Sequence, residues 1–215
     1  MQIIWHGQSC FPVKSKPRES TEEITVVINP FDPKKTGLKL SKLKADIFLL
    51  GCDDLDNNIT KNTAAFTVNS PGEFEIKNNF IAGINSAENT EKKQGKNIIF
   101  SLEIEGVHLI HLGELTSLPE GDILSKIQNV DVLMVPVGGN KVINAKQAIE
   151  IINQIEPRII IPMYYKIPGS KEKLDGVNGF IKELGHNGEE TFDKFKINKK
   201  NLPNEENKVI ILNKK

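Results

Sequence analysis

Short apolar runs, each about the length of a strand, follow one another through the first half of the chain. They are bounded by Gly, Pro, Asn or Asp, which end regular structure, and they are rich in β-branched and aromatic residues. A β-hairpin is predicted where two such runs meet at the two-residue turn Glu105-Gly106. The predicted strands are 2–5, 9–13, 24–29, 47–50, 65–68, 73–76 and 80–84, followed by the hairpin strands 97–104 and 107–112.

The second half changes to an alternation of buried strands and amphipathic helices, which is typical of βαβ units. Asn144 and Gln147 have the spacing of a capping box at the start of one helix. The pattern therefore predicts two sheets with covering helices, within a single domain spanning residues 1–215. The predicted elements are strands at 130–137, 158–163 and 208–213, and helices at about 145–155 and 171–184.

Composition and charge narrow the class of protein. The 215 residues are 38% hydrophobic and 26% charged, as in an ordinary globular domain. Basic and acidic side chains balance at 28 each, so no nucleic-acid partner is expected, because affinity for phosphate depends on concentrated Lys and Arg. One local basic cluster is interpreted as a solvated charged face. It contains Lys194, Lys196, Lys199 and Lys200.

Membrane and secreted classes are not expected. No apolar run reaches the roughly 20 residues that a membrane span needs, and the amino terminus lacks the basic-then-apolar pattern of a signal peptide. We therefore expect a cytoplasmic protein. Cys10 and Cys52 do not form the framework of a secreted disulfide-rich domain and should be free thiols. A small-molecule ligand and a homo-oligomer both remain open as partners.

Side chains with metal-ligand atoms gather in one loop. The apolar run 47–50 suits a strand that is covered on both faces, and Gly51 ends it. Proteins of the α/β class place functional groups at the carboxyl ends of such strands, so this loop is the candidate site. Its polar residues are Cys52, Asp53, Asp54, Asp56, Asn57 and Asn58.

Further sequence blocks occur before and after this loop. They are Ile-Trp-His-Gly-Gln-Ser-Cys-Phe at 4–11, Val-Ile-Asn-Pro-Phe-Asp at 27–32, Ser-Pro-Gly-Glu-Phe-Glu-Ile at 70–76, His-Leu-Gly-Glu-Leu at 111–115, Val-Pro-Val-Gly-Gly at 135–139 and Pro-Arg-Ile-Ile-Ile-Pro-Met-Tyr-Tyr at 157–165. In this order they resemble the metallo-β-lactamase superfamily over nearly the full length. The most similar branch is the small hydrolase group related to ascorbate-6-phosphate lactonase. The resemblance implies an α/β fold, a four-layer αββα sandwich.

The resemblance also implies a pair of zinc ions, which lower the pKa of a bridging water so that hydroxide attacks an ester, lactone or phosphodiester. In this family the strand is followed by Thr-His-x-His-x-Asp-His, and residues 51–57 stand in its place. Of the loop positions only Asp56 keeps a family ligand type. The family's histidine positions hold Cys52, Asp54, Asn57, Glu88 and Tyr164, and Glu114 stands at the bridging aspartate.

The four histidines of the chain do not suggest a replacement zinc site. His108 and His111 lie three apart on a predicted strand, so their side chains should point to opposite faces and cannot chelate one ion. His111 is interpreted as a buried, hydrogen-bonded structural histidine, and His6 in the same way. His186 follows a helix-ending glycine and is interpreted as a surface residue.

Convergence of the remaining acids would be costly. Two like charges about 5 Å apart at an effective dielectric of about 20 repel by about 3 kcal/mol, which raises at least one pKa by about two units. Asp54, Asp56, Glu88 and Glu114 would therefore bind Mg²⁺, Ca²⁺ or Mn²⁺, share protons, recruit Lys141 or Lys166, or fail to converge. Cys52 as a nucleophile is a weaker alternative, because nearby acids would raise its pKa.

Three hypotheses for the function follow. In the first, the protein keeps the fold and cleft of a lactonase-like hydrolase, has lost the zinc-dependent reaction, uses no cofactor, and binds a ligand or assembles with a partner. In the second, it hydrolyses a lactone or phosphodiester with Mn²⁺ or Mg²⁺, or alternatively Zn²⁺, and Asp56 and Glu114 are catalytic. In the third, it is a purely structural partner. No substrate is identified, because loop shape sets specificity.

Overall fold

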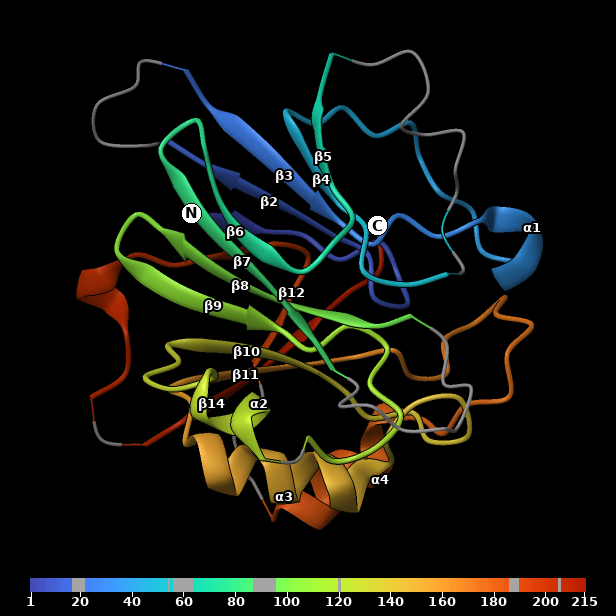
Figure 1. The fold of residues 1–215 in the computed structure, drawn as a ribbon. Helices are drawn as coiled ribbons and strands as arrows, with labels where there is room; N and C mark the ends of the chain where they lie inside the picture. The colour runs from blue at the N-terminus through green and yellow to red at the C-terminus, as the bar shows by residue number, and fades with distance from the viewer. Residues whose placement is uncertain are drawn as a thin grey trace.

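Two β-sheets face each other across a shared apolar core, and helices lie along the outer side of one of them (Figure 1). The structure is a computed structural model that describes residues 1–16, 22–53, 55, 64–86, 96–119, 121–185, 190–204 and 206–215. Buried side chains of both sheets, such as Phe11 and Leu102, belong to one core cluster. The mixed α/β fold with two sheets is confirmed as the resemblance implies.

The smaller sheet has six strands in the order β13-β1-β2-β3-β4-β5. Strands β1, β2 and β3 pair antiparallel, whereas β3, β4 and β5 run parallel. Parallel neighbours bring their carboxyl ends to the same edge, which positions the loop after β4. The strands are β1 (Gln2–Ile3), β2 (Phe11–Ser15), β3 (Ile24–Ile28), β4 (Ile47–Leu49), β5 (Phe66–Val68) and β13 (Phe195–Lys196).

The larger sheet has eight strands in the order β12-β14-β11-β10-β9-β8-β7-β6. Strands β6 to β9 form an antiparallel meander, and β9, β10, β11, β14 and β12 run parallel. The strands are β6 (Gly72–Ile76), β7 (Asn79–Asn85), β8 (Ile98–Ile104), β9 (Val107–His111), β10 (Val132–Pro136), β11 (Ile159–Met163), β12 (Glu190–Phe192) and β14 (Lys208–Leu212).

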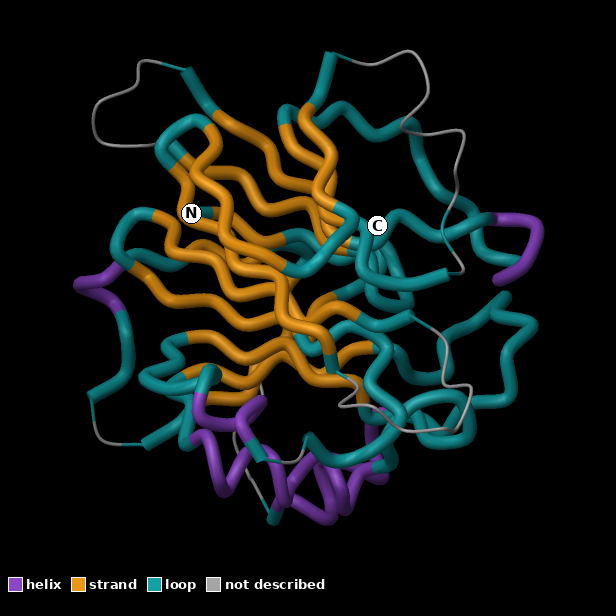
Figure 2. The backbone as a smooth tube through the Cα atoms, viewed as in Figure 1, coloured by secondary structure: helices purple, strands orange, loops and turns teal. Residues whose placement is uncertain are grey.

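Helices α2, α3 and α4 gather beside β10, β11 and β14, as Figures 1 and 2 show. Ala148, Ile151 and Ile152 of α3 are buried, so this amphipathic helix covers the sheet with one face. The described helices are α1 (Pro33–Thr36), α2 (Asp122–Ser125), α3 (Ala145–Ile155), α4 (Val177–Leu184) and the 3₁₀ helix η1 (Lys199–Asn201). None of the helices in these described ranges has both the length and the apolar character needed to span a lipid bilayer.

Two local predictions are confirmed in detail. The Asn144 side chain accepts a hydrogen bond from the backbone N–H of Gln147, and the Gln147 side chain accepts one from the backbone N–H of Asn144, so the capping box is complete. In the hairpin, Glu105 and Gly106 both have positive φ angles of 53° and 73°. Positive φ at both central residues matches the twist of the flanking strands.

Two predicted boundaries are wrong. The strand predicted at 9–13 begins at Phe11 instead, because the chain first makes a tight turn in which Cys10 N–H donates to the Gly7 carbonyl at 3.0 Å. The helix predicted at 171–184 begins at Val177. Upstream, Asp175 N–H donates to the Gly138 carbonyl at 2.7 Å, whereas a helix over 171–184 would pair it with Lys171. Lys171 N–H donates to the Thr36 carbonyl at 2.9 Å, so tertiary contacts hold this segment in a non-helical path.

Candidate functional site

Three strands deliver polar side chains to one edge of the molecule. Cys52, Glu114 and Tyr164 follow the carboxyl ends of β4, β9 and β11. The Cys52 thiol donates to Glu114 Oε1 at 3.1 Å, and the charge of Glu114 acts on the Tyr164 hydroxyl. Two further residues, Ser9 and Glu172, contact this group. We call these five residues the strand-end cluster.

The exit from β4 is held by backbone contacts that leave no room for a side chain at Gly51. Its N–H donates to Asn29 Oδ1 at 2.7 Å, and its carbonyl accepts from Ile98 N–H at 2.8 Å. A Cβ at this position would lie 2.8 Å from the Ile98 carbonyl oxygen. Gly51 therefore determines where the chain carries Cys52, and Asn29 fixes the direction of the turn.

The exit from β9 is built around Asn97. Its side-chain oxygen accepts from Glu114 N–H at 2.7 Å, and its amide nitrogen donates to the Leu112 carbonyl at 3.1 Å. Gly113, between them, has a φ of 68°, and a Cβ there would lie 2.1 Å from Asn97 Oδ1. Glycine is required for both reasons, because a left-handed backbone disfavours side chains. Asn97 and Gly113 thus set the position of the Glu114 side chain.

Glu114 accepts two hydrogen bonds from neutral donors. The hydroxyl of buried Ser9 donates to Oε1 at 3.0 Å, and the thiol of Cys52 donates to the same atom. Cys10 and Cys52 are both buried thiols outside any disulfide, which confirms the prediction. Burial raises the pKa of Cys10 well above its usual range, so this thiol stays protonated near neutral pH.

Tyr164 is held in an unusual backbone conformation with its hydroxyl protonated. Its φ is 52°, and its N–H donates to the Gln8 carbonyl at 3.2 Å. The hydroxyl donates to Glu172 Oε1 at 3.3 Å. Burial raises the pKa of Tyr164 far above its usual range, and the nearby charges of Glu114 and Glu172 raise it further. A phenol in this state donates its proton in a hydrogen bond.

Glu172 was not identified from the sequence, because it falls in the segment predicted to be helical. Its side chain is 8% exposed and forms an ion pair with Lys141 at 2.6 Å. Gln8 Nε2 also donates to this carboxylate. Lys141 was one of two lysines considered as a counter-charge for the acids Asp54, Asp56, Glu88 and Glu114, and it forms an ion pair with Glu172. No motif in the sequence pointed to this pair, which long-range folding brings together.

The histidines on β9 point to opposite faces, as predicted. His111 is fully buried, its Nε2 lies 3.0 Å from the Ser9 carbonyl oxygen, and its Nδ1 accepts from Gly113 N–H at 3.1 Å. Burial lowers the pKa of His111 to about 4, so the ring is neutral and structural, as expected. His108 lies on the other face, where Nε2 is 2.8 Å from Ser101 Oγ. His6 is also buried, and burial lowers its pKa.

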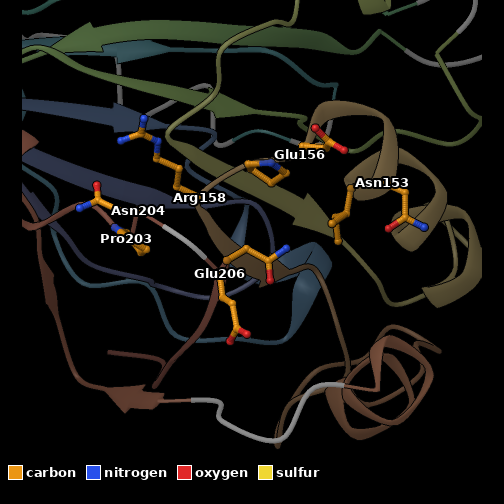
Figure 3. A pocket seen from close by; sticks show the side chains of 9 residues that line it. Asn153, Glu156, Arg158, Pro203, Asn204 and Glu206 are labelled. Atoms are coloured by element: carbon orange, nitrogen blue, oxygen red, sulfur yellow. The ribbon is translucent and has the colours of Figure 1, made fainter.

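A cavity of about 580 Å³ lies at the opposite end of β11, where Arg158 precedes the strand and Tyr164 follows it. Five residues of strand separate the two ends by about 17 Å, so this cavity is distinct from the strand-end cluster. Its lining includes Glu156 and Glu206, whose carboxylates point in different directions in Figure 3. These acids do not converge on a common ligand position.

Comparison with known proteins places this fold. Residues 2–164 match the family described as the Beta-lactamase superfamily domain, which is more than half of the chain. The chain belongs to the metallo-β-lactamase superfamily. A protein of this superfamily from Thermotoga maritima, proposed to be a Zn-dependent hydrolase, superposes with a TM-score of 0.79 at 27% identity, covering 98% of this chain and 97% of that one.

Two of the three further relatives carry hydrolase names. A UPF0173 metal-dependent hydrolase of Thermoplasma acidophilum is 26% identical over 77% of this chain and 83% of its own length. A UPF0173 protein of Pyrococcus abyssi is 24% identical over 86% of this chain and 90% of its own. The metallo hydrolase Igni18 of Ignicoccus hospitalis shares only the fold, with a TM-score of 0.64 at 15% identity over 86% of this chain and 90% of that one.

Part of the superfamily's ligand set lies outside the described residues. Asp54, Asp56, Asn57 and Glu88 belong to the segments that the structure does not describe, and so does His186. Whether the carboxylates of the loop converge with Glu114 therefore stays a prediction. Of the positions that the resemblance assigns to the superfamily's ligands, Cys52, Glu114 and Tyr164 lie within the described ranges.

The described part of the site does not fit the superfamily's zinc pair. Zinc is held by imidazole nitrogens, thiolates and carboxylates that have lost their protons. Here the Tyr164 hydroxyl donates a hydrogen bond to Glu172, and the Cys52 thiol donates one to Glu114. Among the described residues, no group of three or more His, Cys, Asp and Glu side chains is arranged to hold a metal ion. The fold is that of the superfamily, whereas the described side chains are not arranged as a zinc site.

Proposed function

We propose that this protein keeps the scaffold of a metallo-β-lactamase-fold hydrolase, has lost the zinc-dependent reaction, and acts by binding a ligand or by assembling with a partner. The proposal rests on one observation: two side chains at the expected ligand positions act as hydrogen-bond donors. Cys52 donates to Glu114, and Tyr164 donates to Glu172. A zinc pair would have to displace these protons from sites where burial favours the protonated form.

Metal analysis of the full chain purified without chelator tests the loss of zinc. We expect well under one zinc ion per chain, because the described donors are a protonated thiol, a protonated phenol and one carboxylate. The measurement is elemental analysis by mass spectrometry together with equilibrium dialysis against Zn²⁺. Two tightly held zinc ions per chain would refute the proposal.

Restoring the histidines tests whether the scaffold is inherited. The variant combines Cys52→His, Asp54→His, Asn57→His, Glu88→His and Tyr164→His. If the positions are equivalent to those of the superfamily, this variant gains tight zinc binding. The matched control adds Asp56→Ala and Glu114→Ala, which removes the aspartate-type ligands and should lose the gain. A folded five-histidine variant without zinc binding would show that the loops no longer superpose on a metal site.

A second function is favoured by the names of the relatives, which are metal-dependent hydrolases. In this alternative, Glu114 and the carboxylates of the loop hold Mn²⁺ or Mg²⁺, cations that prefer oxygen ligands. Hydrolysis of a lactone or phosphodiester would then depend on added Mn²⁺ or Mg²⁺, and Asp56→Ala and Glu114→Ala would abolish it. Turnover that persists unchanged in both variants rules out this alternative.

Oligomeric state separates ligand binding from assembly. A homo-oligomer in which the strand-end cluster is covered favours a purely structural role, whereas a monomer favours a small-molecule ligand. Size-exclusion chromatography with light scattering measures this directly. Proteolysis or amide hydrogen exchange at residues 112–115, with and without dilution to the monomer, then shows whether assembly covers the cluster.

A further inference from the structure

The exposed face of the meander β7, β8 and β9 carries a group of polar side chains that the strand-end cluster does not use. Ser101 of β8 and His108 of β9 lie on this face, because residues alternate along a strand and their neighbours Leu102 and Leu109 are buried in the core. In Figure 1, α2, α3 and α4 lie beside β10, β11 and β14, and β7 and β8 lie farther along the same sheet.

A cavity of about 340 Å³ opens at this position. Its apolar wall is provided by Phe80, which is 57% exposed, and by Ala82, which stands directly opposite Ser101 in the pairing of β7 with β8. Its polar wall comes from three separate segments of the chain. We call it the outer-face cavity, and its lining includes Phe80, Ser101, His108, Asn129, Asp131 and Lys199.

The hydrogen bonds of His108 define which ring nitrogen carries the proton. Nδ1 lies 3.1 Å from the Asn129 carbonyl oxygen, which can only accept, so Nδ1 is the N–H of the neutral ring. Nε2 then has a free electron pair, and Ser101 Oγ lies 2.8 Å from it. The serine hydroxyl therefore donates to the imidazole, which is the arrangement that makes a serine nucleophilic.

The backbone around His108 is fixed by Asp131. His108 N–H donates to Asp131 Oδ2 and Asp131 N–H donates to the His108 carbonyl, both at 2.9 Å. Asp131 is 4% exposed, and Lys199 Nζ lies 3.1 Å from its Oδ2. The imidazole thus sits on a rigid support, and an ammonium group borders the same cavity. A cation there can stabilise a negative oxygen that forms at Ser101.

We propose that the outer-face cavity is a second, metal-independent acyl-transfer site in which Ser101 is the nucleophile and His108 the general base. The substrate class is an ester with a small apolar acyl group, which would lie against Phe80 and Ala82. Ser101 Oγ forms a bond to the acyl carbon while its proton passes to His108 Nε2. The bond to the leaving oxygen breaks, and His108 returns the proton to the departing alcohol.

Water completes the cycle. His108 takes a proton from water as its oxygen adds to the acyl carbon of the acyl-serine, and the proton then passes to Ser101 Oγ as the serine leaves. The products are one alcohol and one carboxylic acid, so no oxidant, reductant or metal is consumed.

The test uses the full chain and para-nitrophenyl acetate. We expect a burst of nitrophenolate and an acetyl group on Ser101, found by peptide mass mapping. Ser101→Ala should remove the adduct, and His108→Gln should slow acylation at least about tenfold, since a positioned general base contributes that much or more. The matched control is Ser70→Ala, which changes an exposed serine on the chain and should leave the burst unchanged.

Two results would overturn the proposal. One is acetylation of lysines or Ser70 in the wild-type protein at a rate equal to that of Ser101. The other is an unchanged acylation rate in His108→Gln, with circular dichroism showing that the variant is folded. Added chelator should have no effect on the burst, so this result does not depend on whether the strand-end cluster binds metal.

Discussion

Strand β9 supplies a histidine to each of two regions, and the two side chains differ in burial and in hydrogen-bond partners. His111 faces the strand-end cluster side of the core, where burial lowers its pKa to about 4 and both ring nitrogens have partners. His108 faces the outer-face cavity, where Nε2 meets the hydroxyl of Ser101. Around His111 both ring nitrogens are occupied by backbone partners, whereas His108 can take the proton of the Ser101 hydroxyl in the proposed reaction. Residue types alone do not distinguish these roles.

The largest expected loss of stability comes from replacing a glycine by alanine, and it differs between the two regions. Gly113 and Gly106 have similar φ angles of 68° and 73°, so an alanine at either position has the same backbone strain. At Gly113 the new Cβ would lie 2.1 Å from Asn97 Oδ1, whereas at Gly106 it meets nothing within 4 Å. We expect Gly113→Ala to destabilise the fold by about 4 kcal/mol and Gly106→Ala by about 1 kcal/mol.

Denaturant unfolding of both variants and the wild type measures this difference. Because the backbone strain cancels between them, the excess for Gly113→Ala reports the contact with Asn97 alone. Equal losses for the two alanines would mean that the Asn97 side chain moves freely and does not determine the position of Glu114.

Acid should weaken the fold through His111. Its pKa of about 4 in the folded protein lies below the ordinary value of 6.5, so the unfolded chain binds a proton that the folded chain refuses between these values. Stability is therefore fully present above pH 6.5 and falls as pH drops towards 4, by about 3 kcal/mol. His6, whose pKa is also lowered, adds to the loss in the same direction.

Unfolding free energies measured at intervals from pH 7 to pH 4.5 test this prediction. The matched variant His111→Gln cannot take up the proton and should show a flatter curve. A wild-type slope no steeper than that of the variant would indicate that His111 is accessible to protons in the folded state.

Glu114→Gln should have a smaller effect on stability. The change keeps the shape of the side chain but weakens the acceptor of the Ser9 and Cys52 hydrogen bonds, and bonds to a charged group contribute about 2 kcal/mol. The control is Glu73→Gln, which changes an exposed carboxylate on β6 and should be neutral. An increase in stability for Glu114→Gln would instead indicate repulsion between Glu114 and other acids of the loop.

The smallest effect on stability is expected at the outer face. His108→Gln removes side-chain hydrogen bonds to Ser101 and Asn129 at a partly exposed position, with an expected loss of about 1 kcal/mol. Thermal unfolding measures it in the same samples used for acylation. A loss as large as that of Gly113→Ala would mean that His108 mainly supports the fold, and the comparison between the two regions would fail.

Much of the fold was predictable because it depends on local pattern. Alternation and turn residues located the hairpin of β8 and β9, and side-chain spacing located α3 with its capping box. Where predictions were wrong, tertiary contacts decided the backbone. The segment before α4 was assigned to a helix because Val177 and its neighbours form an apolar stripe, but the N–H groups of Lys171 and Asp175 bind other loops.

The candidate site was predictable only in part. Cys52, Glu114 and Tyr164 were identified by their order along the chain, and the structure shows that Cys52 and Glu114 are in contact. Their function stays a prediction. Glu172 was missed because it pairs with Lys141, 31 residues away in sequence, and no local pattern encodes such a contact. The Ser101–His108 contact was missed although both residues lie on the predicted hairpin, because neither residue belongs to a sequence motif.

The sequence by itself determined most of the strands and helices, which face of each strand is buried, and which residue types stand at the positions that the resemblance assigns to zinc ligands. Hydrophobic period and residue identity are local properties, so one chain suffices to read them. The tertiary structure alone decided which donors meet which acceptors: Cys52 with Glu114, Tyr164 with Glu172, and Ser101 with His108. Protonation follows from burial and from those partners, and both arise only when distant segments pack together.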